Sequence, residues 1–80
     1  MVLFVYFQCY RLFFMQIKVN GEMHEFAASL SVAALAEQLR LNPGQVAVER
    51  NLEIVPRSQY AQVMLNEGDT IEIVRFIGGG

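Results

Sequence analysis

The sequence contains few of the residues that build disulfides, metal centres or basic nucleic-acid surfaces. Its single cysteine, Cys9, excludes an intramolecular disulfide, and one cysteine with one histidine, His24, cannot supply the four ligands of an ordinary zinc site. The chain has 6 Lys and Arg against 8 Asp and Glu, so its net charge of −2 argues against a nucleic-acid partner. A chain of 80 residues also leaves little room for a deep pocket. Binding or carrying is therefore favoured over catalysis.

Hydrophobic residues, by contrast, are abundant and unevenly placed. They make up 54% of the chain, which is too apolar for a disordered protein, and 12 of residues 1–14 (MVLFVYFQCYRLFF) are hydrophobic. A transmembrane helix needs about 20 apolar residues, and a signal peptide has a positive start and a small-residue cleavage site that this segment lacks. We therefore expect a cytoplasmic protein with no membrane partner. Residues 1–14 are interpreted as an apolar extension and residues 15–80 as the folded domain.

The extension has two interpretations. A regular strand pattern begins directly at Met15, which favours an upstream start codon and Met15 as the natural first residue. A native extra strand or an amphipathic anchor is the alternative. An exposed apolar, aromatic tail promotes aggregation, so we expect the domain to be more soluble without it.

Alternating apolar and polar residues predict most of the strands. Residues 15–19 alternate with a period of two, which is typical of a half-buried strand. Asn20-Gly21 predicts a type I′ turn into a second strand over 23–26. The remaining elements predicted by pattern and turn residues are strands over 46–50, 54–55 and 70–76, and a helical turn around Tyr60.

One helix is expected between the second and third strands. Ser31 is the predicted N-cap, and apolar residues follow it at helical spacing. We expect Asn42-Pro43-Gly44 to end the helix, because the residue before a proline avoids the α region. This element order predicts a two-layer α+β domain: a mixed, four- to five-stranded sheet with one main helix packed across one face. Its expected core consists of Met15, Ile17, Val19, Leu35, Leu39, Val48, Ile71 and Ile73.

No residue set that would act as a catalytic, metal or nucleotide site is found. His24 shares strand parity with Phe26 and is interpreted as a histidine on the sheet. Glu67-Gly68-Asp69 is interpreted as a turn, because two carboxylates are too few for a calcium site. A glycine-rich phosphate loop before a helix is also missing. We therefore expect no catalytic residue, no metal and no bound cofactor.

The C-terminal residues carry the most informative pattern. Gly78, Gly79 and Gly80 directly follow the last strand. A flexible terminus is one interpretation; the other is a carboxylate on Gly80 that must reach another protein's active site, with Gly78 and Gly79 threading a narrow channel. Parity places Val74 and Phe76 on the sheet face away from the helix. With Ile77 they would form a small patch for a partner, unless the strand is simply apolar on both faces.

Four stretches resemble the ThiS family of thiamine-biosynthesis sulfur carriers, part of the ubiquitin-like β-grasp superfamily. They are MQIKVNG (15–21), SVAALAEQL (31–39), VAVERNLEIVPRSQY (46–60) and NEGDTIEIVRFIGGG (66–80). The third and fourth are the more specific. Residues 1–14 have no counterpart in the family pattern.

The resemblance implies a function. In such carriers a ThiF-like adenylyltransferase uses ATP to activate the terminal carboxylate. Sulfur from a cysteine desulfurase route then replaces AMP, and thiazole synthase (ThiG) takes the sulfur from the resulting thiocarboxylate. Mapped here, Gly80 carries the activated group, and Gly78 and Gly79 form the threading tail. The protein is then a carrier rather than an enzyme.

Two alternatives stay open. The small subunit of molybdopterin synthase also ends in Gly-Gly, but a proline pair is common before its tail, where this sequence has Arg75-Phe76-Ile77. A ubiquitin-like binding module without sulfur transfer is the other. An RNA-associated TGS-type module is disfavoured by the acidic charge balance.

Overall fold

The computed structural model describes residues 13–76. Within this range the chain forms one α-helix and five strands: β1 (Phe14–Val19), β2 (Glu22–Ala27), α2 (Val32–Gln38), β3 (Val46–Arg50), β4 (Glu53–Ile54) and β5 (Thr70–Arg75). Two 3₁₀ turns, η1 (Pro43–Gln45) and η2 (Arg57–Gln59), precede β3 and follow β4. The expected α+β class is confirmed. The described part contains no helix that is long and apolar enough to cross a membrane.

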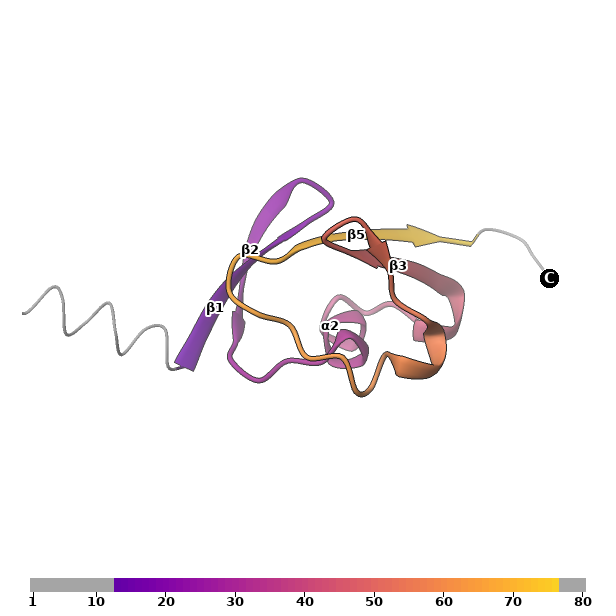
Figure 1. The fold of residues 1–80 in the computed structure, drawn as a ribbon, viewed down its shortest axis with the longest axis horizontal. Coiled ribbons are helices and arrows are strands. Elements are labelled where there is room, and N and C mark those ends of the chain that lie inside the picture. Colours follow the sequence, from indigo (N-terminus) through magenta and orange to yellow (C-terminus); the bar gives the residue numbers. More distant parts are fainter. Residues whose placement is uncertain (1–12, 77–80) are drawn as a thin grey trace, which may run out of the picture.

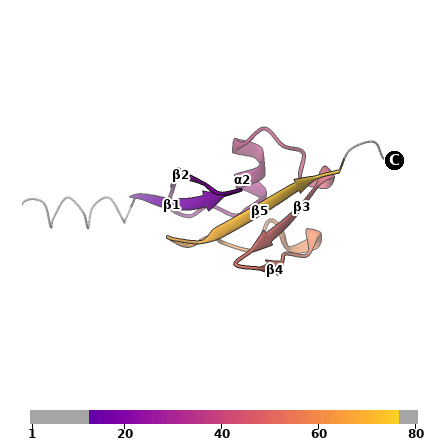
Figure 2. The same cartoon turned by 90° about the horizontal axis from the view of Figure 1, so that it is seen from above.

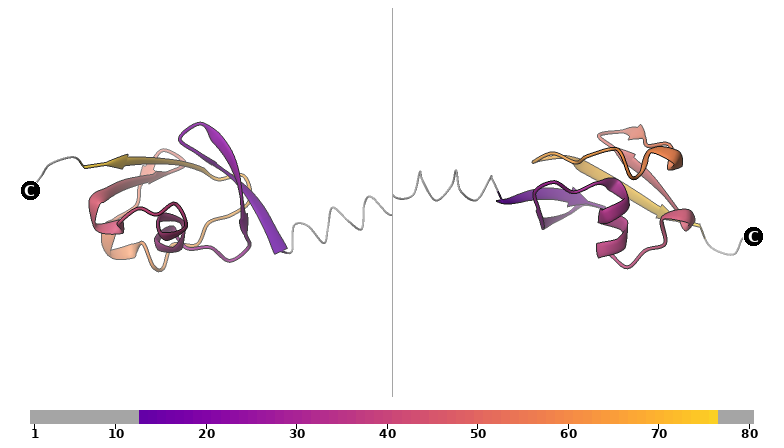
Figure 3. Two further views of the ribbon diagram at one scale, coloured as in Figure 1. Left: turned by 180° about the vertical axis from the view of Figure 1, so that it is seen from behind. Right: turned by 90° about the horizontal axis from the view of Figure 1, so that it is seen from below.

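The five strands form one mixed sheet in the order β2-β1-β5-β3-β4 (Figures 1 and 2). β1 and β5 pair in parallel, whereas the other three neighbouring pairs, β2–β1, β5–β3 and β3–β4, are antiparallel. Helix α2 lies across one face of this sheet (Figure 3), and no helix of residues 13–76 covers the opposite face, called the open face below. The last strand is therefore inserted into the middle of the sheet. The start of β1 and the end of β5 lie at opposite ends of the molecule (Figure 1).

The first hairpin follows the sequence prediction. Asn20 and Gly21 both have positive φ, 49° and 85°, as a type I′ turn requires. The side chain of Asn20 also reaches β5, where Oδ1 accepts from the backbone N–H of Ile73 at 2.7 Å and Nδ2 donates to its carbonyl at 3.2 Å. Asn20 thus sets the turn and fastens the hairpin to the central strand. β1 begins at Phe14, one residue before the predicted start.

The helix begins as predicted but ends earlier. The Oγ of Ser31 accepts a hydrogen bond from the backbone N–H of Ala34 at 3.0 Å, which confirms the N-cap. The prediction that Asn42-Pro43-Gly44 ends the helix was wrong, because α2 stops at Gln38. Arg40 takes a positive φ of 59°, which turns the chain away two residues after the helix ends.

A Schellman arrangement explains this early end. The N–H of Leu41 donates to the carbonyl of Ala36, and the N–H of Arg40 to the carbonyl of Glu37. These two bonds satisfy carbonyls that the end of a helix leaves free. The Asn42-Pro43-Gly44 stretch instead forms η1, where Oδ1 of Asn42 accepts from the N–H of Gly44 at 2.8 Å.

A second two-residue turn joins β3 to β4. Asn51 and Leu52 have φ values of 52° and 71°, so strand pairing resumes at once with Arg50 opposite Glu53. The short strand is therefore Glu53–Ile54, one residue earlier than the predicted 54–55. Val55, which follows it, is buried.

The core lies between the sheet and α2. Six of the eight predicted core residues are buried, and the other two, Leu39 and Ile73, are partly buried and pack against them. The burial of Tyr60 was not predicted: its hydroxyl donates to the carbonyl of Val46 at 3.0 Å. The other buried hydrophobic residues that were not predicted are Phe26, Leu30, Val32, Ala36, Val46, Val55 and Leu65.

Candidate functional site

The predicted partner patch lies partly within the described residues. Val74 and Phe76 are 59% and 53% exposed, whereas Ile71 is buried. Alternation along β5 places Val74 on the face opposite to Ile71. The expected parity of β5 is confirmed for these residues. Ile77, which was assigned to the same patch, and the tail residues Gly78, Gly79 and Gly80 lie outside the described residues.

Phe76, the last described residue, makes one backbone contact and one side-chain contact with other parts of the fold. Its backbone N–H donates to the carbonyl of Gln45 at 2.9 Å, which extends the contact between β5 and the start of β3. The guanidinium carbon of Arg57, from η2, lies 5.8 Å from the centre of the Phe76 ring, within the range of a cation–π interaction. Sequence reasoning did not find Arg57, because no local pattern links it to a residue so far along the chain.

The start of β5 is fixed by the buried carboxylate of Asp69. Its Oδ2 accepts from Nε of Arg50 at 2.9 Å and from the backbone N–H of Asn66 at 2.8 Å, and its Oδ1 accepts from Nδ2 of Asn51 at 3.0 Å. Burial alone would raise the pKa of Asp69, but these hydrogen bonds and the Arg50 charge outweigh it, so the pKa is lowered. This network joins the β3–β4 turn to the strand that leads to the tail.

The Glu67-Gly68-Asp69 stretch is a turn, as predicted. Gly68 has a φ of 84°, and the Glu67 carboxylate accepts from the backbone N–H of Gln16 at 3.2 Å. The carboxylates of Glu67 and Asp69 therefore both accept hydrogen bonds that stabilise the fold. No group of three or more His, Cys, Asp or Glu that could hold a metal occurs among residues 13–76.

His24 lies on the sheet, as its interpretation required. Its ring stacks on Phe26 with the centroids 6.0 Å apart, and Nε2 lies 3.8 Å from a carboxylate oxygen of Glu22. The contact with Phe26 confirms that the two residues share a face. At 3.8 Å the Glu22 oxygen is beyond hydrogen-bonding distance of Nε2, so it does not orient the ring as the carboxylate beside a catalytic histidine does.

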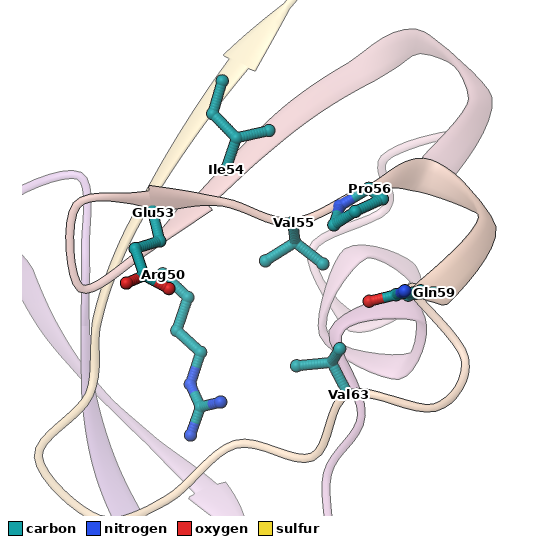
Figure 4. A pocket seen from close by; sticks show the side chains of 7 residues that line it. All are labelled: Arg50, Glu53, Ile54, Val55, Pro56, Gln59 and Val63. Carbon is teal, nitrogen blue, oxygen red and sulfur yellow. The ribbon is translucent and has the colours of Figure 1, made fainter.

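A small hollow lies beside β4 (Figure 4). Its volume is about 160 Å³, and it is lined by Arg50, Glu53, Ile54, Val55, Pro56, Gln59 and Val63. Arg50, Val55 and Val63 extend into the space, whereas the side chain of Ile54 points away from it (Figure 4). Ligand pockets typically measure about 300–1,000 Å³, so this hollow is small for an organic cofactor.

The order β2-β1-β5-β3-β4 with one helix across the sheet defines a β-grasp domain of the ubiquitin-like class. Its candidate site is the end of the central strand, where Val74 and Phe76 are exposed. The chain belongs to the ThiS family, whose model matches residues 17–80.

Individual relatives agree with this family. The chain is 39% identical over 66 residues to the sulfur carrier protein ThiS of Escherichia coli, covering 82% of this chain and 100% of that protein. The crystal structure of the thiamine biosynthesis protein ThiS from Geobacter metallireducens superposes with a TM-score of 0.72 at 33% identity, covering 82% of this chain and 100% of that one.

A third relative is much longer than this chain. The chain is 58% identical over 66 residues, 82% of its length, to a protein of Paramagnetospirillum magneticum named thiazole synthase. It spans only 20% of that protein. The similarity therefore concerns a fifth of a longer polypeptide.

Proposed function

We propose that this protein is a sulfur carrier for thiazole formation in thiamine biosynthesis, with Gly80 as the residue that carries sulfur. The observation that carries the proposal is the position of Gly78-Gly79-Gly80 in the sequence, three residues after a central strand that ends at Arg75 and is followed by the exposed Phe76. A rigid strand in the middle of the sheet gives the tail a fixed origin. Family membership supports the same function.

The proposed chemistry takes place on the terminal carboxylate. A carboxylate oxygen of Gly80 attacks the α-phosphate of ATP in the active site of a ThiF-like adenylyltransferase, forming an acyl adenylate and releasing pyrophosphate. The terminal sulfur of a persulfide formed by a cysteine desulfurase then attacks the acyl carbon and expels AMP, which leaves an acyl disulfide. A thiol attacks the other sulfur of that disulfide, forms a new disulfide with it and releases the C-terminal thiocarboxylate. The carrier itself supplies no acid, base or metal.

Electrostatics around the hollow beside β4 support ATP binding by the partner rather than by the carrier. Arg50 is the cation there, but it is already paired with Asp69, and Glu53 adds a second carboxylate. These three side chains carry a net charge of −1, which repels a triphosphate. The hollow is thus unsuited to ATP both in size and in charge.

Thiazole synthase is the proposed acceptor of the sulfur. Two relatives, 58% and 47% identical to this chain, are named thiazole synthase, and the chain matches 20% of each. A carrier-like segment joined to a longer polypeptide of that name fits a carrier that delivers sulfur to thiazole synthase. The family match also favours service in thiamine biosynthesis over the small subunit of molybdopterin synthase.

The partner patch has a defined role in this proposal. Val74, Phe76 and Ile77 would dock on the adenylyltransferase while the three glycines enter its active site. Glycine residues suit a narrow channel, because they lack a Cβ and accept extended conformations without a side-chain clash. Arg57 would act as a positioning residue, because its guanidinium contacts the ring of Phe76, two residues before the first glycine of the tail.

Intact-mass measurement tests the proposal. The protein is expressed with its ThiF-like adenylyltransferase and a cysteine desulfurase, and the C-terminal peptide is weighed. We expect a species in which one oxygen is exchanged for sulfur, and its absence when Gly80 is deleted. A full-length protein that never acquires this mass under conditions where the adenylyltransferase is active would overturn the proposal. Recovery of thiazole synthase in a pull-down with this protein would favour a role in thiamine biosynthesis over a role as the small subunit of molybdopterin synthase.

A further inference from the structure

A row of three side chains crosses the open face of the sheet. Ile54 of β4 lies opposite Glu49 of β3, and Glu49 lies opposite Glu72 of β5. Directly paired residues project from the same face. Figure 2 looks onto this face, with β5, β3 and β4 side by side and α2 behind them.

Glu49 and Glu72 form an unfavourable pair in the isolated protein. Residues directly opposite on neighbouring strands have Cβ atoms about 4.5–5.5 Å apart, and like charges in such a pair are destabilising. Neither glutamate takes part in an ion pair within residues 13–76, where Arg50 pairs with Asp69 and the His24 ring lies near Glu22. Lys18 projects from the same face, where it lies opposite Thr70, and it contributes no ion pair to either glutamate.

Exposed apolar side chains lie on both sides of this pair. Ile54 is 74% exposed at the end of the row, and Val74, two residues after Glu72, is 59% exposed opposite Ala47. Phe76 continues the same face toward the tail. An apolar surface with two unpaired carboxylates at its centre suits a protein surface that combines apolar contact with a positive charge.

We propose that this face docks a protein that places a lysine or arginine side chain between Glu49 and Glu72 and packs apolar side chains on Ile54 and Val74. The inference rests on the proposed function, because the docked protein is the ThiF-like adenylyltransferase that must also receive the tail. Two carboxylates are too few for a calcium site, and no group of three or more potential metal ligands occurs among residues 13–76. The negative charge of the row also disfavours nucleic acid.

The proposal predicts that removing the two negative charges leaves the protein as stable or more stable but weakens its binding to the adenylyltransferase. Glu49→Gln with Glu72→Gln removes the like-charge repulsion, so the melting temperature should stay the same or rise. The same double variant loses the attraction to the partner's cation. Its affinity for the purified adenylyltransferase should fall about tenfold at low salt, and the salt dependence of the affinity should become weaker. Glu37→Gln is the matched control, because Glu37 is an exposed glutamate on α2, away from the open face.

A second variant tests the apolar part of the surface. Ile54→Ala should weaken binding at every salt concentration, because it removes apolar contact rather than charge. The inference is overturned if the double glutamine variant binds as tightly as the parent, or if Glu37→Gln weakens binding equally.

Measurement of sulfur loading distinguishes a wrong docking surface from a wrong carrier function. Unchanged binding by the double variant, together with loss of loading on deletion of Gly80, overturns only the docking surface. Loading that survives deletion of Gly80 overturns the carrier function itself.

Discussion

Arg50 and Asp69, 19 residues apart, join the end of β3 to the start of β5 through a hydrogen bond of 2.9 Å between Nε and Oδ2. The bond belongs to a network in which the Asp69 carboxylate accepts three hydrogen bonds. This network therefore fixes the start of β5, the strand whose other end precedes the tail in the sequence.

Replacement of Asp69 should destabilise the fold. Asp69→Ala removes the acceptor of three partly buried hydrogen bonds, from Arg50, Asn51 and Asn66, which costs about 1–3 kcal/mol of unfolding free energy. Urea unfolding at pH 7 measures the change. Glu37→Gln, on the exposed side of α2, is the control and should change stability by no more than about 0.5 kcal/mol.

The same carboxylate predicts an acid-sensitive stability. The pKa of Asp69 in the folded protein lies below its ordinary value of 3.8. Its stabilising contribution is therefore complete above pH 3.8 and is lost as the pH falls through the lowered pKa. Unfolding free energies of the parent and Asp69→Asn, measured at a series of pH values, should differ above this window and converge below it. A constant difference across the series would contradict the prediction.

Leu52 should be replaceable by glycine with a gain in stability. It is 86% exposed and has a φ of 71°, a left-handed conformation that costs an L-residue roughly 1–2 kcal/mol. Part of this gain is offset by the greater freedom of glycine in the unfolded chain, so we expect Leu52→Gly to stabilise by up to about 1 kcal/mol. Leu52→Ala keeps the strain and should give no such gain. Thermal melts of both variants separate backbone strain from removal of an exposed apolar side chain.

Removal of the N-terminal extension should leave the fold and the sulfur loading intact. The structure refines where to cut, because the carbonyl of Phe13 accepts from the N–H of Ala28 and Phe14 pairs with Ala27. A chain beginning at Phe13 should match the parent in stability, and one beginning at Met15 should lose no more than about 1 kcal/mol. Solubility should rise in both. A large loss of stability in the chain that begins at Phe13 would show that the preceding residues pack as a native element.

The tail prediction concerns Gly80 and Gly79. Deleting Gly80, or adding a residue after it, should abolish ATP–pyrophosphate exchange by the adenylyltransferase, because the reacting carboxylate is displaced. Gly79→Val should act similarly, since a β-branched residue resists a close-fitting extended path. Thermal melts of all three variants should match the parent. Exchange and sulfur loading by the Gly80 deletion would favour a ubiquitin-like binding module instead.

Phe76→Ala should weaken partner binding more than stability. The side chain is 53% exposed, so its loss removes little core packing, and only the contact with Arg57 and the surface patch are affected. Calorimetric titration with the adenylyltransferase, alongside a thermal melt, measures both effects. Arg57→Ala is the companion variant: it should shift affinity in the same direction and by a smaller amount, because it acts through Phe76. A loss of stability without a loss of affinity would assign Phe76 a purely structural role.

The sequence alone determined the features that depend on local interactions. Period-two alternation located β1, β3 and β5, because a half-buried strand exposes every second residue. Asn20-Gly21 specified its turn through positive φ, and Ser31 specified its cap through a hydrogen bond three residues away. The Gly78-Gly79-Gly80 tail and the resemblance to sulfur carriers also lie in the sequence itself.

Only the tertiary structure decided the features that join distant residues. The end of α2 came from a positive φ at Arg40, a residue without a helix-ending sequence signal. The contact of Arg57 with Phe76 and the pairing of Glu49 with Glu72 depend on where β5 enters the sheet. That register is set by packing of the whole core and by long-range hydrogen bonds, so no local pattern along the chain encodes it.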